Sequence, residues 1–193
     1  MFKPVLELAA ETAATWTKRP LALVAGLVGP TQQAISEAKI ALGIGYHAGL
    51  LSLAGMASAS EDEIIAHCEA VAREIPLVGF YLQPAVGGVI LSANFWQRFA
   101  AIDNVIAIKI APFNRYRTLD VLRGVALAGA EERVSLYTGN DDHIVLDLLA
   151  PFAVDAGGRG GLRSTGIYAD AAVAAISFWE FNATRRRTST ATL

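Results

Sequence analysis

The chain has 193 residues, enough for a single domain with a sizeable core. Hydrophobic residues make up 53% of it, and its mean hydropathy of +0.40 favours an α/β fold with buried parallel strands. A net charge of −2, with lysine and arginine spread thinly, argues against a nucleic-acid-binding face, and the single cysteine excludes an internal disulfide. Since a lone cysteine is typical of a reducing compartment, we expect a cytoplasmic protein.

The first segment, Met1–Lys18, has the apolar spacing of a helix and lacks the apolar stretch of a secretory signal. After it, short apolar runs alternate with amphipathic helical patterns, as in repeated βα units. Strands are expected at 21–27, 48–53, 77–82, 105–111 and 134–139, with a weak sixth near 160–162. Helices are expected between them and at about 169–181, before a disordered tail over 182–193.

Several local signals indicate where helices begin and end. Gly43 is a candidate C-terminal stop for the helix after the first strand. Ser60, with Glu63 three residues later, has the spacing of a capping box, and Ser92 is a candidate N-cap. Cys68 falls on the apolar stripe of the helix that Ser60 opens, so we expect it to be buried.

The stretch from Ile40 to Ser60 carries no charge over roughly the length of a membrane span. Four glycines divide it, and it is better interpreted as a helix end, a loop and a strand. We therefore expect no membrane partner.

A lysine lies in the middle of the apolar run Val105–Ala111, "VIAIKIA". Because side chains alternate across a strand, its three isoleucines are expected on the helix-facing side, and Val105, Ala107, Lys109 and Ala111 on the other. Burial disfavours the charged ammonium form, and a free amine is a nucleophile that forms a Schiff base with a ketone. The alternative is a structural ion pair with a buried carboxylate.

The same alternation in "LVGFYL", Leu77–Leu82, predicts Val78, Phe80 and Leu82 on the helix-facing side. Gly79 and Tyr81 would then share the opposite side with Lys109. A phenol in that position could transfer protons while an imine forms, whereas the alternative is a tyrosine that fills the core.

Three segments in this order resemble the dihydrodipicolinate synthase / N-acetylneuraminate lyase family. They are "GFYLQPAVGG" (79–88), "NVIAIKIAPFNR" (104–115) and "LYTGNDD" (136–142). The resemblance implies a (β/α)8 barrel and a carbon–carbon or carbon–oxygen lyase that acts on a 2-oxo acid such as pyruvate. It further implies Lys109 as the imine-forming lysine, Tyr81 as the proton relay, and Gly139, Asp141 and Asp142 as a turn that contacts the distal part of the substrate.

The family's first two strands have no counterpart, so residues 1–181 are expected to form one partial barrel of about six βα units. An incomplete barrel would expose apolar surface and favour association, so a homo-oligomer is expected. A second hypothesis is therefore an inactive remnant, or a subunit that a partner completes.

The implied mechanism needs no metal and no organic cofactor. His47, His67 and His143 lack metal-ligand spacing, which argues against a zinc-dependent aldolase. The glycine-rich stretches match no complete nucleotide-binding fingerprint.

Overall fold

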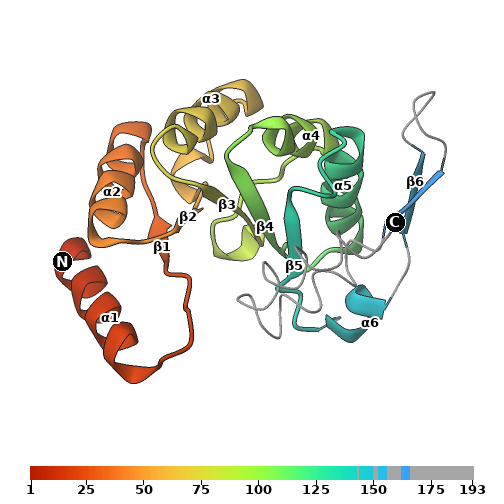
Figure 1. The fold of residues 1–193 in the computed structure, drawn as a ribbon. Coiled ribbons are helices and arrows are strands. Elements are labelled where there is room, and N and C mark those ends of the chain that lie inside the picture. The colour runs from red at the N-terminus through yellow and green to blue at the C-terminus, as the bar shows by residue number, and fades with distance from the viewer. Residues whose placement is uncertain (143, 150–151, 156–161, 166–193) are drawn as a thin grey trace.

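The protein is described from a computed structural model that covers residues 1–142, 144–149, 152–155 and 162–165. Its main body is a five-stranded parallel sheet with helices along one side (Figure 1). The strands are β1 (Val24–Leu27), β2 (Ala48–Leu51), β3 (Leu77–Leu82), β4 (Val105–Ala111) and β5 (Ser135–Thr138). The helices are α1 (Phe2–Trp16), α2 (Thr31–Ile44), α3 (Glu61–Ala72), α4 (Ala93–Ala101), α5 (Arg115–Leu127) and α6 (Ile144–Leu149).

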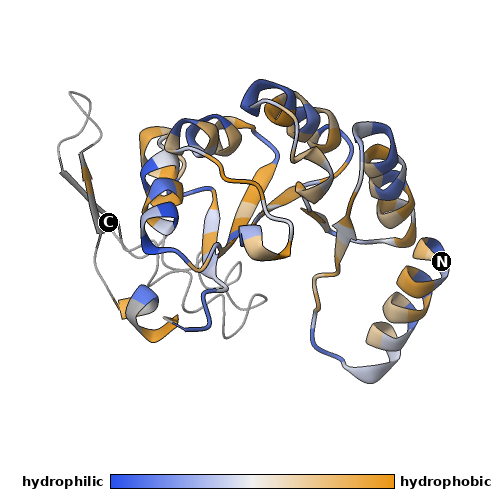
Figure 2. Cartoon of the chain, turned by 180° about the vertical axis from the view of Figure 1, so that it is seen from behind, coloured by the Kyte–Doolittle hydropathy of each residue, from blue (hydrophilic) through white to orange (hydrophobic). Residues whose placement is uncertain are grey.

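The order of the strands in the sheet follows the order of the chain, β1-β2-β3-β4-β5. Successive right-handed crossovers in one direction bring the connecting helices to the same face. This singly wound arrangement is that of a barrel wall rather than of a doubly wound sheet, which carries helices on both faces. The expected fold class is confirmed: five consecutive α/β units of the barrel type. Figure 2 shows hydrophobic residues along the strands, while the helices carry both hydrophobic and hydrophilic ones.

The helix ends follow the expected local signals with one exception. Ser60 and Glu63 form the expected capping box, and the Ser92 hydroxyl accepts a hydrogen bond from the amide of Phe95. The expected stop at Gly43 is wrong, because α2 continues to Ile44 and ends at Gly45. Gly45 has φ 102°, a left-handed conformation that glycine adopts without strain, whereas Gly43 stays helical.

The segment 40–60 comprises the end of α2, strand β2 and a short 3-10 turn, Ala54–Met56, as expected. None of the helices in the described part of the chain is both long and apolar enough to cross a membrane.

The expected sixth strand of the parallel sheet is wrong. Residues 162–165 form β7 (Leu162–Thr165), which pairs antiparallel with β6 (Phe152–Asp155) in a separate two-stranded sheet. The glycines that precede this strand in the sequence do not specify which sheet the strand joins. The helix expected at 169–181 and the tail expected at 182–193 lie outside the described residues.

Arg133 connects the end of α4 to the start of β4. Its guanidinium donates hydrogen bonds to the carbonyls of Ala100, Ile102, Asp103 and Val105. The last carbonyls of a helix have no partner within the helix, and Arg133 provides one for the Ala100 carbonyl at the end of α4.

Helix α1 lies beside α2, next to the β1 edge of the sheet (Figure 1). Of its described side chains, Leu6 is the one that is buried, and the Tyr46 hydroxyl donates to the Leu6 carbonyl over 3.2 Å.

Helices α4 and α5 approach closely at Gly124. A Cβ at this position would lie 2.5 Å from Trp96 Cβ and 2.7 Å from the backbone nitrogen of Gln97. We expect Gly124→Ala to lower the free energy of unfolding by about 1–3 kcal/mol, measured by urea denaturation, because the helices must separate. Gly43→Ala is the matched control: a Cβ there meets nothing, and the change should stabilise α2 by about 0.5–1 kcal/mol. Equal stabilities of the two variants would contradict the close approach.

Candidate functional site

Lys109 lies on the face of the sheet that the helices do not cover. Its strand neighbours Ile108 and Ile110 are buried in the main core, whereas Ala107 packs in a second cluster with Ala48 and Val78. Lys109 follows the parity of Ala107, as expected from the alternation of side chains. The side chain is half-buried rather than fully enclosed.

A β-bulge alters the start of the same strand. Leu77 pairs with Val105, but Val78 pairs with Ala107, so Ile106 is an extra residue. Val105 consequently packs in the main core, and Ile106 packs against the Ala107 cluster. The expected faces of Val105 and Ile106 are therefore wrong, while those of residues 107–110 are confirmed.

The expected orientation of β3 is also wrong. Gly79 faces the helices, since a Cβ there would lie 2.7 Å from Phe99 Cε1. Tyr81 has the same parity and belongs to the helix-side core, whereas Val78 and Phe80 face the side of Lys109. Glycine leaves room for the Phe99 ring of α4, which is the physical reason for this orientation.

Tyr81 is a buried core residue. Its ring centroid lies 4.9 Å from that of Trp96, and its hydroxyl both donates to the Leu91 carbonyl and accepts from the Leu91 amide, each over 3.3 Å. Burial raises the pKa of Tyr81. The phenol thus lies on the opposite face of the sheet from Lys109.

The register partners of Lys109 on both neighbouring strands are aromatic residues. On β3, its Nζ lies 5.0 Å from the centre of the Phe80 ring, a cation–π distance. On β5, Tyr137 is its direct register partner. A Cβ on Gly139 would lie 3.2 Å from Lys109 Cε, so the lysine extends toward the carboxyl end of β5. Among the described residues, no carboxylate forms an ion pair with Lys109.

Sequence reasoning missed Tyr137. Its side chain is half-buried and packs against the Ala107 cluster, and burial raises the pKa of its phenol to about 12. The alternation in "VSLYTG" could have revealed it, since Leu136 is buried on the helix side and Tyr137 must point the other way.

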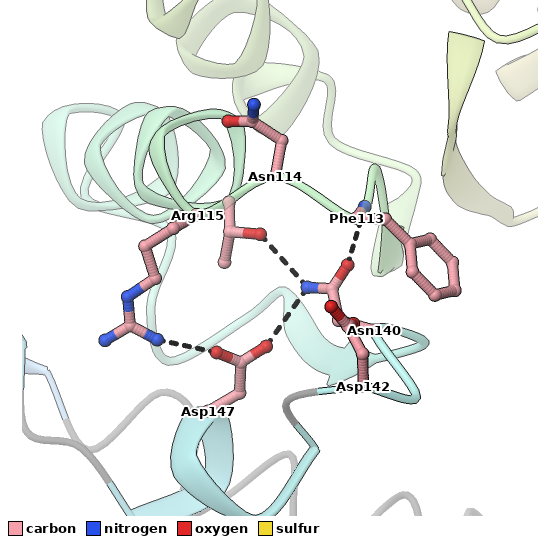
Figure 3. Close-up of a pocket in the computed structure, with 7 residues that line it drawn as sticks. Phe113, Asn114, Arg115, Asn140, Asp142 and Asp147 are labelled. Carbon is pink, nitrogen blue, oxygen red and sulfur yellow. Dashed lines mark hydrogen bonds and ion pairs between the residues drawn. The ribbon is translucent and has the colours of Figure 1, made fainter. Parts of the chain in front are cut away.

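The loops that follow β4 and β5 are joined by Asn140 (Figure 3). Its Oδ1 accepts from the Phe113 amide over 2.9 Å, and its Nδ2 donates to Thr118 Oγ1 and Asp147 Oδ2, both over 3.0 Å. Phe113 has φ 50°, a left-handed conformation that is strained for a residue with a Cβ. The buried Asn140 side chain holds this backbone in place.

A cavity of about 110 Å³ lies beside this network at the carboxyl edge of the sheet. Its lining comprises Phe113, Asn114, Arg115, Thr118, Asn140, Asp142 and Asp147. Asp147 is buried and accepts a hydrogen bond from Arg115 over 2.7 Å. The carboxyl edge is where parallel α/β folds build their sites.

The structure separates the three residues expected to bind substrate. Gly139 lies beside Lys109, Asp142 lines the cavity, and Asp141 is exposed and outside its lining. Over the described residues, no group of three His, Cys, Asp or Glu side chains gathers as metal ligands do, and His143 lies outside them.

No family model and no curated protein matches the sequence. Solved structures do match. The YagE prophage protein of E. coli K12, a dihydrodipicolinic acid synthase family member in complex with pyruvate, is 21% identical, with a TM-score of 0.64 over 77% of this chain and 49% of that one. The chloride-inhibited dihydrodipicolinate synthase of Acinetobacter baumannii, complexed with pyruvate, is 22% identical, with a TM-score of 0.62 over 96% of this chain and 62% of that one.

A third match is dihydrodipicolinate synthase DapA-2 of Bacillus anthracis, 16% identical, with a TM-score of 0.60 over 96% of this chain and 60% of that one. At these identities the likeness shows the fold. The chain spans about half the length of the matched structures.

Removal of the Asn140 side chain should loosen the joined loops. We expect Asn140→Ala to lower the free energy of unfolding by about 1–3 kcal/mol, because the buried partners of its amide lose their hydrogen bonds. Urea denaturation measures the loss. Asn94→Ala, at an exposed position on α4, should stay within about 0.5 kcal/mol of the wild type. If both variants have the stability of the wild type, Asn140 does not join the loops.

The raised pKa of Tyr137 predicts that stability depends on alkaline pH. The folded state holds this proton up to about pH 12, while the unfolded state releases it near its ordinary pKa of 10.0. Stability contributed by Tyr137 is therefore complete below about pH 10 and is lost as the pH rises toward 12. Urea denaturation across this range should show a shallower loss in Tyr137→Phe than in the wild type. Identical slopes would contradict the raised pKa.

Proposed function

We propose that this chain, which has the fold of dihydrodipicolinate synthases, is a Schiff-base-forming lyase that acts on a 2-oxo acid such as pyruvate. The observation that carries the proposal is the position of Lys109. It lies on the face away from the helices, near the carboxyl ends of the strands, and a Cβ on Gly139 would lie only 3.2 Å from its Cε. The pyruvate complexes of two structures with this fold support the substrate class.

The absence of a carboxylate partner among the described residues leaves the Lys109 amine available to a substrate. Within the described chain no carboxylate pairs with it, so the alternative of a structural ion pair has no support there. The neutral amine would attack the keto carbon and form an imine, which withdraws electrons from the adjacent carbon. Carbon–carbon bond formation or cleavage follows at that carbon.

The relay role of Tyr81 stays a prediction of the sequence resemblance, and the orientation of its phenol toward α4 does not support it. A cytoplasmic location and a homo-oligomer also stay predictions. The second hypothesis, an inactive remnant or a partner-completed subunit, predicts the same fold but no reaction at Lys109, so chemical trapping separates the two.

Borohydride reduction traps a lysine imine as a stable adduct. We expect incubation with pyruvate and borohydride to label Lys109, identified by mass spectrometry of the peptides. Lys109→Met should abolish the label because it removes the amine. Lys39→Met is the matched control: this exposed lysine on α2 pairs with Glu74 at 3.5 Å, and its replacement should leave the label on Lys109.

The same treatment of the A. baumannii enzyme provides a positive reference. If that enzyme is labelled and Lys109 in the wild-type chain is not, the lyase proposal fails and the remnant hypothesis is favoured.

A further inference from the structure

His67 is buried at the contact between α2 and α3, although its side chain can carry a charge. It is 2% exposed, and its Nδ1 lies 2.9 Å from the hydroxyl oxygen of Thr31, the first residue of α2. Its Nε2 is also buried and has no hydrogen-bond partner in the part of the chain that the structure describes. Because hydrogen bonds satisfy most buried polar groups, this nitrogen is a weak point in the contact between the two helices.

The neutral form of the His67 ring fits this position, and the protonated form does not. In a neutral imidazole one nitrogen donates and the other accepts, and the Thr31 hydroxyl can serve Nδ1 in either role. Protonation makes both nitrogens donors, so a positive charge would be buried while the Nε2 proton lacks an acceptor. Burial accordingly lowers the pKa of His67. The protonated ring is therefore stable only where water reaches it.

The charged groups of α2 are engaged with partners other than His67. Glu37 accepts hydrogen bonds from the Val28 amide and from Gln33. Lys39 pairs with Glu74, just beyond the end of α3, at 3.5 Å. Strands β1, β2 and β3 carry no charged residue.

The charged groups of α3 and α4 also leave His67 without a counter-ion. Those in the first turn of α3 bind helix caps or an arginine of α4, in the pairs Glu61–Ser92, Glu63–Ser60 and Asp62–Arg98. Glu69 is exposed, two positions from His67 and so on another side of α3. Among the described residues no carboxylate forms an ion pair with His67.

Helix α2 is attached to the body mainly by small side chains. Its buried residues are Ala34, Ala38 and Ala41, which bury less apolar area than larger aliphatic side chains do. The Lys39–Glu74 pair is partly exposed, and exposed ion pairs contribute little to stability. Helix α1 lies beside α2, so a displaced α2 would take α1 with it (Figure 1). One buried charge is therefore large relative to the interactions that hold α2 in place.

We propose that His67 is a pH-sensitive switch, which holds α2 against α3 when neutral and releases α2, together with α1, when it is protonated in mildly acidic solution. Release lets the charged ring reach water. The inference is independent of the lyase proposal, since it involves neither Lys109 nor its neighbours.

The lowered pKa determines the direction of the pH dependence. The packed state binds the proton more weakly than the released state, in which His67 has its ordinary pKa of 6.5. The stabilisation from His67 is therefore complete above about pH 6.5 and is lost as the pH falls below that value. Each pH unit below 6.5 raises the population of the released state by up to about tenfold, until the pKa of the packed ring is reached.

Hydrogen exchange followed by mass spectrometry tests the switch. The exchange rate of α1 and α2 peptides in the wild type is divided by the rate in His67→Gln at the same pH, which cancels the intrinsic pH dependence of exchange. Glutamine can still bond to Thr31 but takes up no proton in this range. We expect the ratio to rise about three- to tenfold from about pH 7.5 to about pH 5.5, while the amides of β4 stay protected.

His47→Gln is the matched control. His47 is exposed, and its Nδ1 accepts a hydrogen bond from the Leu23 amide over 3.0 Å. The wild type and His47→Gln should show the same rise relative to His67→Gln. A ratio that does not change with pH, or a rise that His47→Gln removes, would overturn the switch. Equal exchange of α2 and β4 amides would overturn it too, because α2 would then open only when the whole sheet unfolds.

A measurement on the wild type covers the case in which His67→Gln fails to fold, which circular dichroism would reveal. The carbon-bound ring protons of His67 report its titration in proton NMR spectra. We expect a midpoint below 6.5 in the folded protein, and a midpoint at or above 6.5 would overturn the inference.

Discussion

The absence of a side chain at Gly79 determines the arrangement around Lys109. The ring of Phe99 occupies the space where a Cβ would lie, so this point of β3 can face only α4. Strict alternation then sends Phe80 to the other side, within 5.0 Å of the lysine amine, and buries Tyr81 under the helix. A contact between a helix and a strand thus determines which aromatic residue lies beside the Lys109 amine.

Hydrogen bonds from two different side chains hold the two ends of β4. At its start, Arg133 binds the carbonyl of Val105 at the bulge and the carbonyls at the end of α4. At its end, Asn140 ties the strained Phe113 backbone to the loop after β5. The strand that carries Lys109 is therefore restrained on both sides of the lysine, as a site that depends on orientation requires.

Local patterns predicted much of the fold, and long-range contacts account for what they did not predict. The five strands and the Ser60 cap depend on neighbours in sequence, and the face of Lys109 followed from Ile108 and Ile110. In β3 both sets of alternate residues are apolar, so parity alone could not choose a face. The bulge at Ile106 depends on pairing between strands, and the Asn140 network joins residues from three elements.

Helix α1 is attached to the body more weakly than its fifteen residues suggest. Within the described chain, Leu6 is the buried side chain of α1, and the Tyr46 hydroxyl donates a hydrogen bond to the Leu6 carbonyl. Because Leu6 is the one buried side chain described in α1, the amides of this helix should exchange with solvent through a low-energy subglobal opening. The amides of β4 should exchange with solvent only when the whole sheet unfolds. The protein is thereby divided into a labile N-terminal element and a cooperative unit around the lysine strand.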